Sequence, residues 1–396
     1  MNEPIAIVGA ARTPMGAFQG ALAPLSAPEL GGVAIAAALE RAGRGPDEVD
    51  EAIVGCVLPA GQGQAPARQA GFAGGLTEAT PATTVNKMCG SGMKAVMLAC
   101  DQLSAGGARV ILAGGIESMT NAPYLLPRMR SGARLGHAEA KDHMFLDGLE
   151  DAYEPGRLMG SFAEDCADKY GFTREAQDAF ALASLSRAQE ALTSGAFNDE
   201  IAPLSIKTRK GALTVDEDEP PKTARPDKIP HLKPAFREGG TVTAANASSI
   251  ADGAAALVLM PESEAKASGA TVLARIQGHA SHAQAPNWFT TAPIGAVTKL
   301  LKRIDWSPED VDLWEINEAF AVVPMAAMED LALAHEAVNV RGGACALGHP
   351  IGASGARILV TLLYALRSEG KRRGVATLCI GGGEGAAVAV ELADGF

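Results

Sequence analysis

The chain is organised around the stretch Thr83-Thr84-Val85-Asn86-Lys87-Met88-Cys89-Gly90-Ser91-Gly92-Met93-Lys94-Ala95. The β-branched residues at its start favour a strand, and the glycines that follow let the backbone turn sharply. From Ser91 onward apolar side chains recur at helical spacing, at Met93, Val96, Met97, Cys100 and Leu103. The sequence therefore predicts a strand, a tight turn and a helix that ends at Gly106-Gly107.

Cys89 lies just before the N-terminus of that predicted helix. Backbone N–H groups and the positive end of the helix dipole favour a thiolate there, and a thiolate is a nucleophile. Most free cysteines are small buried hydrophobes, but the flanking glycines favour the reactive interpretation here. The same residues also fit G-x-G-x-x-A, the dinucleotide fingerprint. That interpretation is weak because Asp101, the nearest acidic residue, comes too early and lies inside the helix.

Length and composition exclude several classes of protein. A chain of 396 residues predicts two or three domains, and a net charge of −12 argues against a nucleic-acid binder. Six scattered cysteines without a C-x-x-C motif predict no disulfide framework. No signal peptide is recognisable and no apolar run reaches the length of a membrane span, so a cytoplasmic protein without a membrane partner is expected.

Strand and helix patterns alternate in the first part of the chain. Strands are expected at residues 5–8, 52–57 and 109–113, the last ending at Gly114-Gly115, with a helix at residues 29–42. This alternation predicts a mostly parallel α/β sheet. Between about residues 118 and 246 the pattern changes, with helices at 161–170 and 174–193, the second capped by Thr173, and a loop-rich segment at 203–237. We interpret this section as an insertion.

The first pattern returns after Val272 as an internal repeat. Pro46–Asp50 recurs as Pro308–Asp312, and the helix at 29–42 has its counterpart at 294–304. The helix start Ser91–Ala95 recurs as Ser354–Ile358. The strand Val110–Gly115 recurs as Thr377–Gly382. The sequence therefore predicts two similar α/β halves whose strand ends can bind a ligand between them.

Candidate chemical groups gather in three loops of the second half. By the repeat, His349 falls near the position equivalent to Cys89, which makes it a candidate base. Cys379 precedes three glycines whose backbone N–H groups suit an oxyanion site. Cys345 and His349 form a single i, i+4 pair, which is poor support for zinc. A Cys–His–Asn hydrolase site could combine Cys89, His349 and Asn317, but would leave Cys379 unexplained.

Four of these blocks resemble the signature blocks of the thiolases. They are Asn86–Gly92, Asn317–Phe320, Gly348–Gly352 and Cys379–Gly383, and the similarity runs essentially from end to end of the chain. It includes Ala10–Pro14 and Thr241–Ser248. The resemblance implies duplicated α/β halves that form a layered α-β-α-β-α core with an inserted loop domain. The implied domains are residues 1–120 completed by 247–270, the insert at 121–246, and residues 271–396.

The resemblance also implies a role for each reactive residue. Cys89 would be acylated by a thioester, His349 would take the thiol proton and help to bind the thioester oxygen, and Cys379 would serve as general acid and base. Asn317 would hold a water in one oxyanion hole, and the backbone N–H groups of Cys89 and Gly381 would form the other. Such an enzyme joins two acetyl-CoA molecules to acetoacetyl-CoA and coenzyme A, or cleaves the product in reverse.

The partners implied are acyl-CoA and coenzyme A as substrates, with no separate cofactor and no metal, and a homotetramer built as a dimer of dimers. A locally basic segment between Lys222 and Arg237 is expected near the adenine and phosphates of coenzyme A. The expected coenzyme A and substrate contacts are Lys222, Lys228, Phe236, Ser248, Leu158, Met159, Phe289 and Phe320.

Three positions differ from the common bacterial biosynthetic pattern. Leu158 replaces a histidine, Lys222 replaces an arginine, and Trp288-Phe289 replaces a segment that carries a methionine. Lysine lacks the planar guanidinium that stacks on adenine, and a bulky aromatic residue narrows an acyl pocket. At Tyr124–Leu126, Asp147–Leu149 and Tyr153 the insert resembles the loop of the short-chain, acetoacetyl-CoA subgroup rather than that of the long-chain β-oxidation type. This resemblance favours the short-chain type.

Three alternatives remain open at this point. The first is a broader 3-ketoacyl-CoA thiolase of fatty-acid β-oxidation. The second is a decarboxylating ketosynthase, which shares the fold but uses a Cys-His-His set that the Cys379 block argues against. The third is a non-catalytic acyl-CoA-binding protein.

Overall fold

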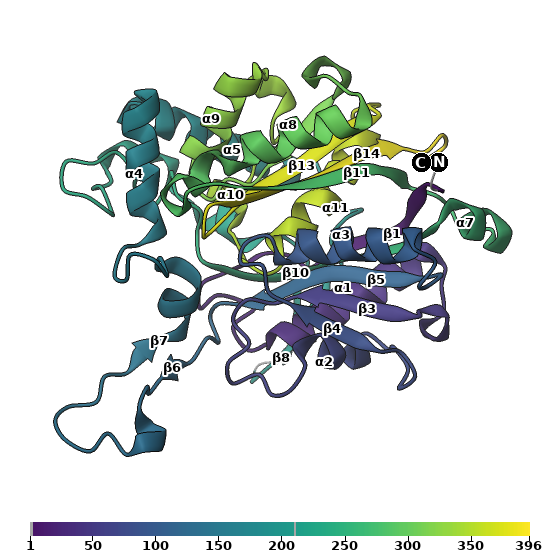
Figure 1. The fold of residues 1–396 in the computed structure, drawn as a ribbon, viewed down its shortest axis with the longest axis horizontal. Coiled ribbons are helices and arrows are strands. Elements are labelled where there is room, and N and C mark those ends of the chain that lie inside the picture. Colours follow the sequence, from purple (N-terminus) through teal and green to yellow (C-terminus); the bar gives the residue numbers. More distant parts are fainter. Residues whose placement is uncertain (1–2, 210) are drawn as a thin grey trace.

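A computed structural model describes residues 3–209 and 211–396. Its centre is a mixed sheet of ten strands that runs in the order β12-β13-β14-β11-β1-β10-β5-β3-β4, with β2 beside β10 (Figure 1). The strands of the first half are β1 (Ile5–Arg12), β2 (Gly16–Ala17), β3 (Glu51–Gly55), β4 (Ala82–Val85), β5 (Ile111–Ser118) and β10 (Ala251–Pro261). Those of the second half are β11 (Ala274–Ala283), β12 (Leu313–Ile316), β13 (Arg373–Ile380) and β14 (Glu384–Leu392).

The expectation of a mostly parallel sheet is wrong. Among the strands that the structure describes, the parallel pairs are β3 with β4, β3 with β5, and β12 with β13. The reason is the insertion of one strand into each half. β10 enters antiparallel between β1 and β5, and β14 enters antiparallel between β11 and β13. Alternation of strands and helices along the sequence did not reveal these two late strands.

The two halves repeat the same strand order and meet at one seam. Strand β1 pairs antiparallel with β11 over Ile5–Ile7 and Ala274–Ile276. Next to β12, Val338 forms a parallel bridge to Trp314, in the place that β4 takes beside β3. The predicted duplication is therefore present in the pairing pattern, and its 3₁₀ turns η1 (Pro46–Glu48) and η6 (Pro308–Asp310) also match.

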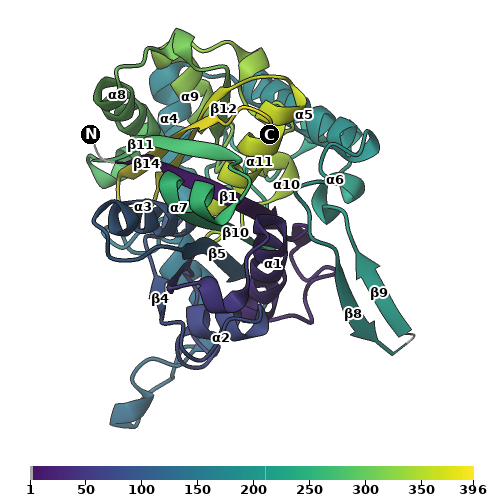
Figure 2. The ribbon, with the colours of Figure 1, turned by 90° about the vertical axis from the view of Figure 1, so that its right-hand side faces the viewer.

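Helices form three layers around the two half-sheets (Figures 1 and 2). α3 (Ser91–Ser104) and α11 (Ser354–Ser368) contact each other and both half-sheets, so they form the middle layer. α1 (Ala27–Ala42) and α2 (Pro66–Ala73) cover the outer face of the first half, while α8 (Ala292–Ile304) and α9 (Val322–Leu331) cover the second. The main apolar clusters follow these layers, which gives the α-β-α-β-α arrangement.

β5 is longer than the sequence suggested, because it continues through Gly114-Gly115 to Ser118. A side chain at Gly114 would place its Cβ 2.2 Å from the Ala255 carbonyl oxygen, and one at Gly115 would lie 2.1 Å from the Gly352 oxygen. These glycines therefore serve close approach of the backbone rather than strand termination.

The segment between β5 and β10 lies outside the sheet. Thr173 caps α5 by accepting a hydrogen bond from the Ala176 N–H, as the sequence predicted. The loop-rich expectation for residues 203–237 missed a hairpin, which projects from the body in Figure 2. The elements here are β6 (Tyr124–Leu125), β7 (Lys141–Asp142), η3 (Phe145–Leu149), α4 (Met159–Tyr170), α5 (Arg174–Thr193), β8 (Leu204–Thr208), β9 (Gly211–Val215), α6 (Glu219–Thr223) and η4 (Pro226–His231).

The domain boundaries proposed from the sequence stay a prediction. Two short helices complete the elements used below, α7 (Glu262–Ser268) and α10 (Ala344–Leu347). Within residues 3–209 and 211–396, no helix is both long and apolar enough to cross a bilayer.

Candidate active site

One cavity of about 330 Å³ collects residues from both halves and from the segment between β5 and β10. The predicted site residues that line it are Cys89, His349, Gly381, Ser248, Met159, Phe289 and Phe320. Residues that the sequence prediction did not assign to the site complete the wall, namely Met88, Leu146–Tyr153, Ala319, Ile351 and Gly382. The cavity therefore joins the nucleophile candidate and the base candidate as the repeat suggested.

The middle helices bring these two residues together. α3 and α11 approach so closely that a Cβ on Gly92 would lie 2.9 Å from the Ala356 nitrogen, and one on Gly355 would lie 2.4 Å from the Met93 nitrogen. Glycine at both N-terminal turns therefore lets the two helix starts meet. Each helix start presents its preceding loop to the same cavity, and these loops carry Cys89 and His349.

Cys89 follows a residue in an unfavourable backbone conformation. Met88 has φ of 47°, a left-handed region that bulky residues rarely adopt. The turn is stabilised from both sides, because the Met88 N–H donates to Asn86 Oδ1 (3.0 Å) and Ser91 Oγ donates to the Met88 carbonyl (2.6 Å). These bonds fix the direction in which Cys89 leaves the backbone.

The hydrogen bonds of His349 define its tautomer. Its Nδ1 lies 2.5 Å from Ser354 Oγ, and the Ser354 hydroxyl donates its proton to the Pro350 carbonyl (2.9 Å). Because that proton is already committed, Nδ1–H must donate to Ser354 Oγ. Among the described residues nothing bonds His349 Nε2, so this nitrogen carries a free lone pair. His349 is thus oriented to accept a proton at Nε2.

Burial sets the protonation states of the pair. It raises the pKa of Cys89 to about 11, although hydrogen bonds from the Gly381 and Cys89 N–H groups oppose this. Burial thus opposes the thiolate that the helix terminus favours. Burial, with the nearby charge of Arg357, lowers the pKa of His349 to about 3. At neutral pH both groups are uncharged, a thiol and an imidazole that line the same cavity.

Cys379 and Asn317 are buried and do not line the cavity. The pKa of the Cys379 thiol is raised well above its usual value by burial, with Cys89 as the next cause. Both polar atoms of the Asn317 amide lack a hydrogen-bond partner within the described part of the chain. A buried amide of this kind can bind a water molecule.

A buried ion pair lies further inside. Arg357 and Glu315 are joined at 3.5 Å, and both side chains are shielded from solvent. Burial lowers the pKa of Arg357 and raises that of Glu315 to about 8. This pair supplies the positive charge that disfavours a protonated His349.

The aromatic residues of the cavity pack edge to face. Phe289 contacts Phe162 at a ring distance of 6.2 Å and Phe320 at 6.4 Å, and Phe236 contacts Phe320 at 5.9 Å. Phe236 therefore lies near the cavity without lining it, and Leu158, which precedes the lining residue Met159, does not line it either. Phe289 itself is buried and forms part of the wall.

A second cavity, of about 570 Å³, is lined by Lys228, Arg225, Ser249 and Ile250, among others. Ser249 adjoins Ser248 of the first cavity, so the two openings share one segment of chain. Lys228 forms no ion pair with any residue that the structure describes. Lys222 lines neither cavity and pairs with Glu217 at 2.6 Å.

The sequence did not identify Glu117, Ser354 or the Met88 conformation as parts of the site. A signal for Glu117 existed, since an acidic residue directly after Gly114-Gly115-Ile116 is unusual in a buried strand. Separately, no group of three or more His, Cys, Asp or Glu side chains among the described residues could hold a metal ion.

Comparison with known protein families gives two matches that together span most of the chain. The model described as "Thiolase, N-terminal domain" matches residues 5–263, and "Thiolase, C-terminal domain" matches residues 270–392.

Full-length relatives agree with this result. The acetyl-CoA acetyltransferase of Thiocystis violacea is 50% identical over 393 residues, covering 99% of this chain and 100% of the relative. That of Cupriavidus necator is 50% identical over 390 residues, covering 98% and 99%. The crystal structure of the Bacillus anthracis acetyl-CoA acetyltransferase superposes with a TM-score of 0.96 at 41% identity, covering 99% and 100%. A thiolase of Ascaris suum in complex with coenzyme A gives 0.94 at 41% identity, with the same coverage.

Proposed function

This chain belongs to the thiolase family, and we propose that it is an acetyl-CoA C-acetyltransferase. It condenses two acetyl-CoA molecules to acetoacetyl-CoA and coenzyme A, or cleaves acetoacetyl-CoA in reverse. The observation that carries the proposal is the meeting of a Cys89 thiol and an unpartnered Nε2 of neutral His349 in one cavity. The relatives that bear this activity in their names match the chain over almost its whole length.

In cleavage, Cys89 Sγ attacks the ketone carbon of acetoacetyl-CoA while His349 Nε2 takes the thiol proton. The bond between that carbon and the α-carbon breaks, and the electrons go to the leaving acetyl-CoA carbanion. Cys379 donates a proton to this carbanion, a role that suits a thiol whose pKa is raised. Acetyl-CoA then departs as the first product, and the acetyl group that contained the ketone carbon remains bound to Cys89.

The acetyl group then passes to coenzyme A. Cys379, which became a thiolate when it protonated the carbanion, takes the proton of the coenzyme A thiol and is restored. The coenzyme A thiolate attacks the acetyl carbon, and Cys89 leaves as the thiol after recovering its proton from His349. Two oxyanion sites stabilise the negatively charged oxygens that form during these steps. A water bound by Asn317 together with His349 forms one site, and the N–H groups of Cys89 and Gly381 form the other. The order of steps reverses for condensation.

Coenzyme A is proposed to reach the cavity along Ser248. Its phosphates would lie at the second cavity, where Lys228 offers an unpaired positive charge. A thiolase of Ascaris suum was solved in complex with coenzyme A, which supports this ligand class for the chain. Lys222 would have to leave Glu217 before it could contact the nucleotide.

The acyl specificity is proposed to be short. Phe289 and Phe320 pack edge to face at the wall of a cavity that also receives Met88 and Met159. A longer acyl chain would need to displace these buried rings. A broader 3-ketoacyl-CoA thiolase is the alternative that this wall disfavours.

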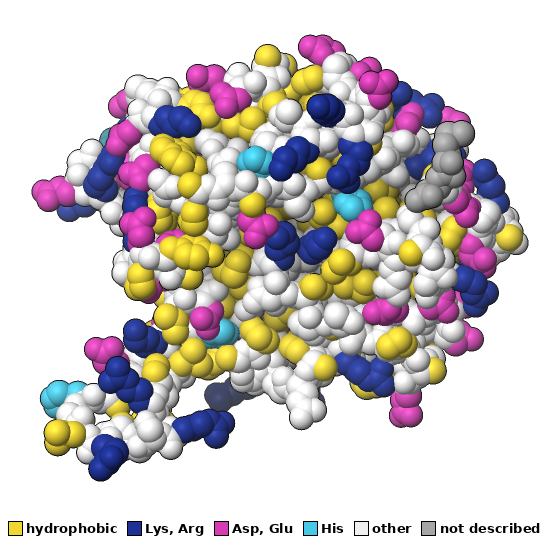
Figure 3. Space-filling view, in the orientation of Figure 1, with side chains coloured by type: hydrophobic (Ala, Val, Ile, Leu, Met, Phe, Trp, Pro, Cys, Tyr) yellow, Lys and Arg dark blue, Asp and Glu magenta, His cyan; other side chains and the backbone are white. Residues whose placement is uncertain are grey.

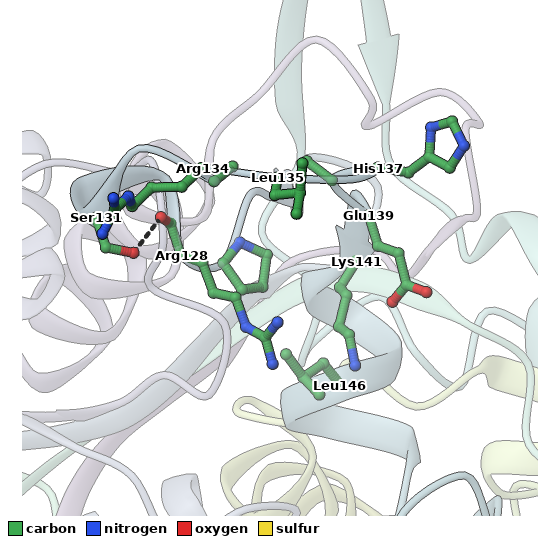
Figure 4. Close-up of a pocket in the computed structure, with 11 residues that line it drawn as sticks. Arg128, Ser131, Arg134, Leu135, His137, Glu139, Lys141 and Leu146 are labelled. Atoms are coloured by element: carbon green, nitrogen blue, oxygen red, sulfur yellow. Dashed lines mark hydrogen bonds between the residues drawn. The ribbon is translucent and has the colours of Figure 1, made fainter.

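We also propose that the chain is cytoplasmic and assembles as a homotetramer through the arm, residues 121–143. The arm projects from the body and carries exposed Leu135, Met129 and Leu126 (Figure 1). Figure 3 shows lysine and arginine side chains gathered on it, and Figure 4 shows Arg128 and Lys141 extending toward Leu146. An apolar surface rimmed by charge is typical of a contact between subunits.

Coenzyme A-dependent cleavage of 3-ketoacyl-CoA tests the function. The proposal predicts rapid cleavage of acetoacetyl-CoA and much slower cleavage of a longer chain. Comparable rates on both would assign the broader activity, and Phe289→Ala would then be expected to change little. Binding of acyl-CoA without turnover of either substrate would instead identify a binding protein.

A further inference from the structure

Glu117 is a buried carboxylate for which the proposed mechanism has no use. It lies near the end of β5, where it is fully shielded from solvent. Four donors share its two oxygens. Oε1 accepts from the Leu58 N–H (3.1 Å) and the Cys56 thiol (3.6 Å), while Oε2 accepts from the N–H groups of Val57 (3.0 Å) and Gly352 (2.8 Å).

These donors come from two different parts of the site. Gly352 belongs to the His349 loop, residues 348–353, which precedes α11. Val57 belongs to the segment that follows β3, and its carbonyl accepts from the Asn86 amide (3.3 Å) beside Cys89. One carboxylate thus connects the loop of the base to the loop of the nucleophile.

The backbone is shaped for this contact. A Cβ on Gly352 would lie 2.6 Å from Glu117 Oε2 and 2.6 Å from the Ile116 carbonyl oxygen. Only glycine lets the His349 loop come this close to the end of β5. The close approach of the His349 loop to the end of β5 therefore depends on the glycine at position 352.

We propose that Glu117 is a positioning residue that holds the His349 loop against the Cys89 half of the molecule. It touches no substrate and acts through Gly352 and the segment 56–58. The inference rests on the proposed function, because productive geometry between His349 and Cys89 is what it secures.

The charge of Glu117 adds a dependence on pH. Burial raises its pKa to about 7, while the Val57, Leu58 and Gly352 N–H groups lower it. The titratable groups that face it are the Cys56 thiol from the end of β3 and the Cys89 thiol from the loop before α3; the His349 loop presents a peptide N–H. A proton on either oxygen would remove one acceptor site and weaken the connection.

The first experiment compares the wild type with Glu117→Gln in cleavage of acetoacetyl-CoA across pH. An amide offers one acceptor oxygen, and its NH₂ group would face two donors, either the Val57 and Gly352 N–H groups or the Leu58 N–H and the Cys56 thiol. We expect kcat to fall about 10²-fold, as for a misplaced catalytic group, with KM for coenzyme A within about threefold. The wild-type rate should fall as the pH drops through 7, which gives the pH profile an acid limb. The variant should lack this acid limb.

Two milder variants separate positioning from loss of folding. In Cys56→Ser a hydroxyl donates a stronger hydrogen bond than the thiol, so the acid limb should move to lower pH. In Cys56→Ala that donor is gone, so the limb should move to higher pH. If Glu117→Gln does not fold, these opposite shifts of the acid limb test the role of Glu117 in its place.

Glu262→Gln is the matched control. Glu262 is a buried carboxylate at the start of α7 that pairs with Arg275 of β11 (2.9 Å), and it lies outside both cavities. It should keep the wild-type pH profile. A folded Glu117→Gln with wild-type kcat and acid limb would overturn the proposal, as would identical limbs in the two Cys56 variants.

A failure of the proposed function would be seen separately, as a wild type that does not turn over. In that case the alkylation of Cys89 by iodoacetamide replaces turnover as the measurement. Loss of the facing anion should shift the alkylation midpoint of Glu117→Gln to lower pH. An unshifted midpoint would contradict the role of Glu117.

Discussion

At the scale of single residues, the site depends on one neutral histidine whose proton is placed by a serine. Ser354 Oγ accepts from His349 Nδ1–H because its own proton is bonded to the Pro350 carbonyl. This leaves Nε2 free to take the Cys89 proton. The raised pKa of Cys89 and the lowered pKa of His349 mean that this transfer occurs with the reaction rather than before it.

Ser354→Ala should therefore slow turnover more than it weakens binding. Loss of the acceptor leaves a buried N–H unsatisfied and the ring free to rotate, at a cost of about 1–3 kcal/mol. If this cost falls on the transition state, kcat drops roughly tenfold or more. Steady-state kinetics measure it, with Ser26→Ala at the exposed cap of α1 as control. A Ser354→Ala enzyme with unchanged kcat would argue against the assigned tautomer.

The lowered pKa of His349 also predicts how stability depends on pH. The folded chain holds His349 neutral, with a pKa lowered from 6.5 to about 3. Its contribution to stability is thus present above pH 6.5 and is lost as the pH falls from 6.5 toward 3.

Thermal unfolding should be measured above pH 6.5 and at pH values between 6.5 and 3. On acidification the melting temperature should fall further in the wild type than in His349→Gln. The exposed His137→Gln serves as control and should follow the wild type. Equal losses in the wild type and His349→Gln would mean that His349 is not held neutral by the fold.

At the scale of elements, the crossing of α3 and α11 builds the site. The duplicated helix starts are closely packed at Gly92 and Gly355, and each carries a serine that bonds a carbonyl of its preceding loop. The repeat in the sequence predicted that these helices correspond. It could not predict that glycine would let them touch.

Gly355→Ala tests this crossing. Its Cβ would lie 2.4 Å from the Met93 nitrogen, so the helices must separate. We expect a loss of roughly 1–3 kcal/mol of stability from overpacking, together with reduced kcat. Chemical denaturation and steady-state kinetics measure the two effects. Gly107→Ala, at the opposite end of α3 beside a flexible Gln102 side chain, should change both far less.

The sequence predicted some elements well and others poorly for physical reasons. Apolar periodicity and capping placed α3 and α5 closely, because these signals are local. The direction of strand pairing was wrong because β10 pairs with β1 and β5, and β14 with β11, all of them distant in the chain. β14 also forms an antiparallel hairpin with its neighbour β13. Cys89 and His349 could be predicted from flanking glycines and the repeat. The thiol state of Cys89 and the contacts of Glu117 could not, since both depend on burial that arises only in the folded chain.

At the scale of the whole molecule, the arm is the feature that a single chain leaves without an explanation. Its Leu135 is 99% exposed, which is costly for an apolar side chain unless another surface covers it. The arm also concentrates positive charge on a chain whose net charge is −12. Both properties favour a contact with a second copy.

Leu135→Asp should lower the oligomer mass measured by light scattering. The matched control is Leu213→Asp, which places the same charge on the exposed β9 of the hairpin. A reduced mass in the first variant alone supports assembly through the arm. An unchanged mass in Leu135→Asp would show that the arm does not hold the oligomer together.

The central claim is that Cys89 carries the acyl group, and mass spectrometry of the quenched enzyme tests it most directly. After incubation with acetoacetyl-CoA in the absence of free coenzyme A, the wild type should gain the mass of one acetyl group. Peptide mapping should place that group on Cys89, and added coenzyme A should remove it. In Cys89→Ala no acetyl group should be trapped, while Cys56→Ala should be acetylated like the wild type. An acetyl group on another residue, or turnover by Cys89→Ala, would contradict the mechanism.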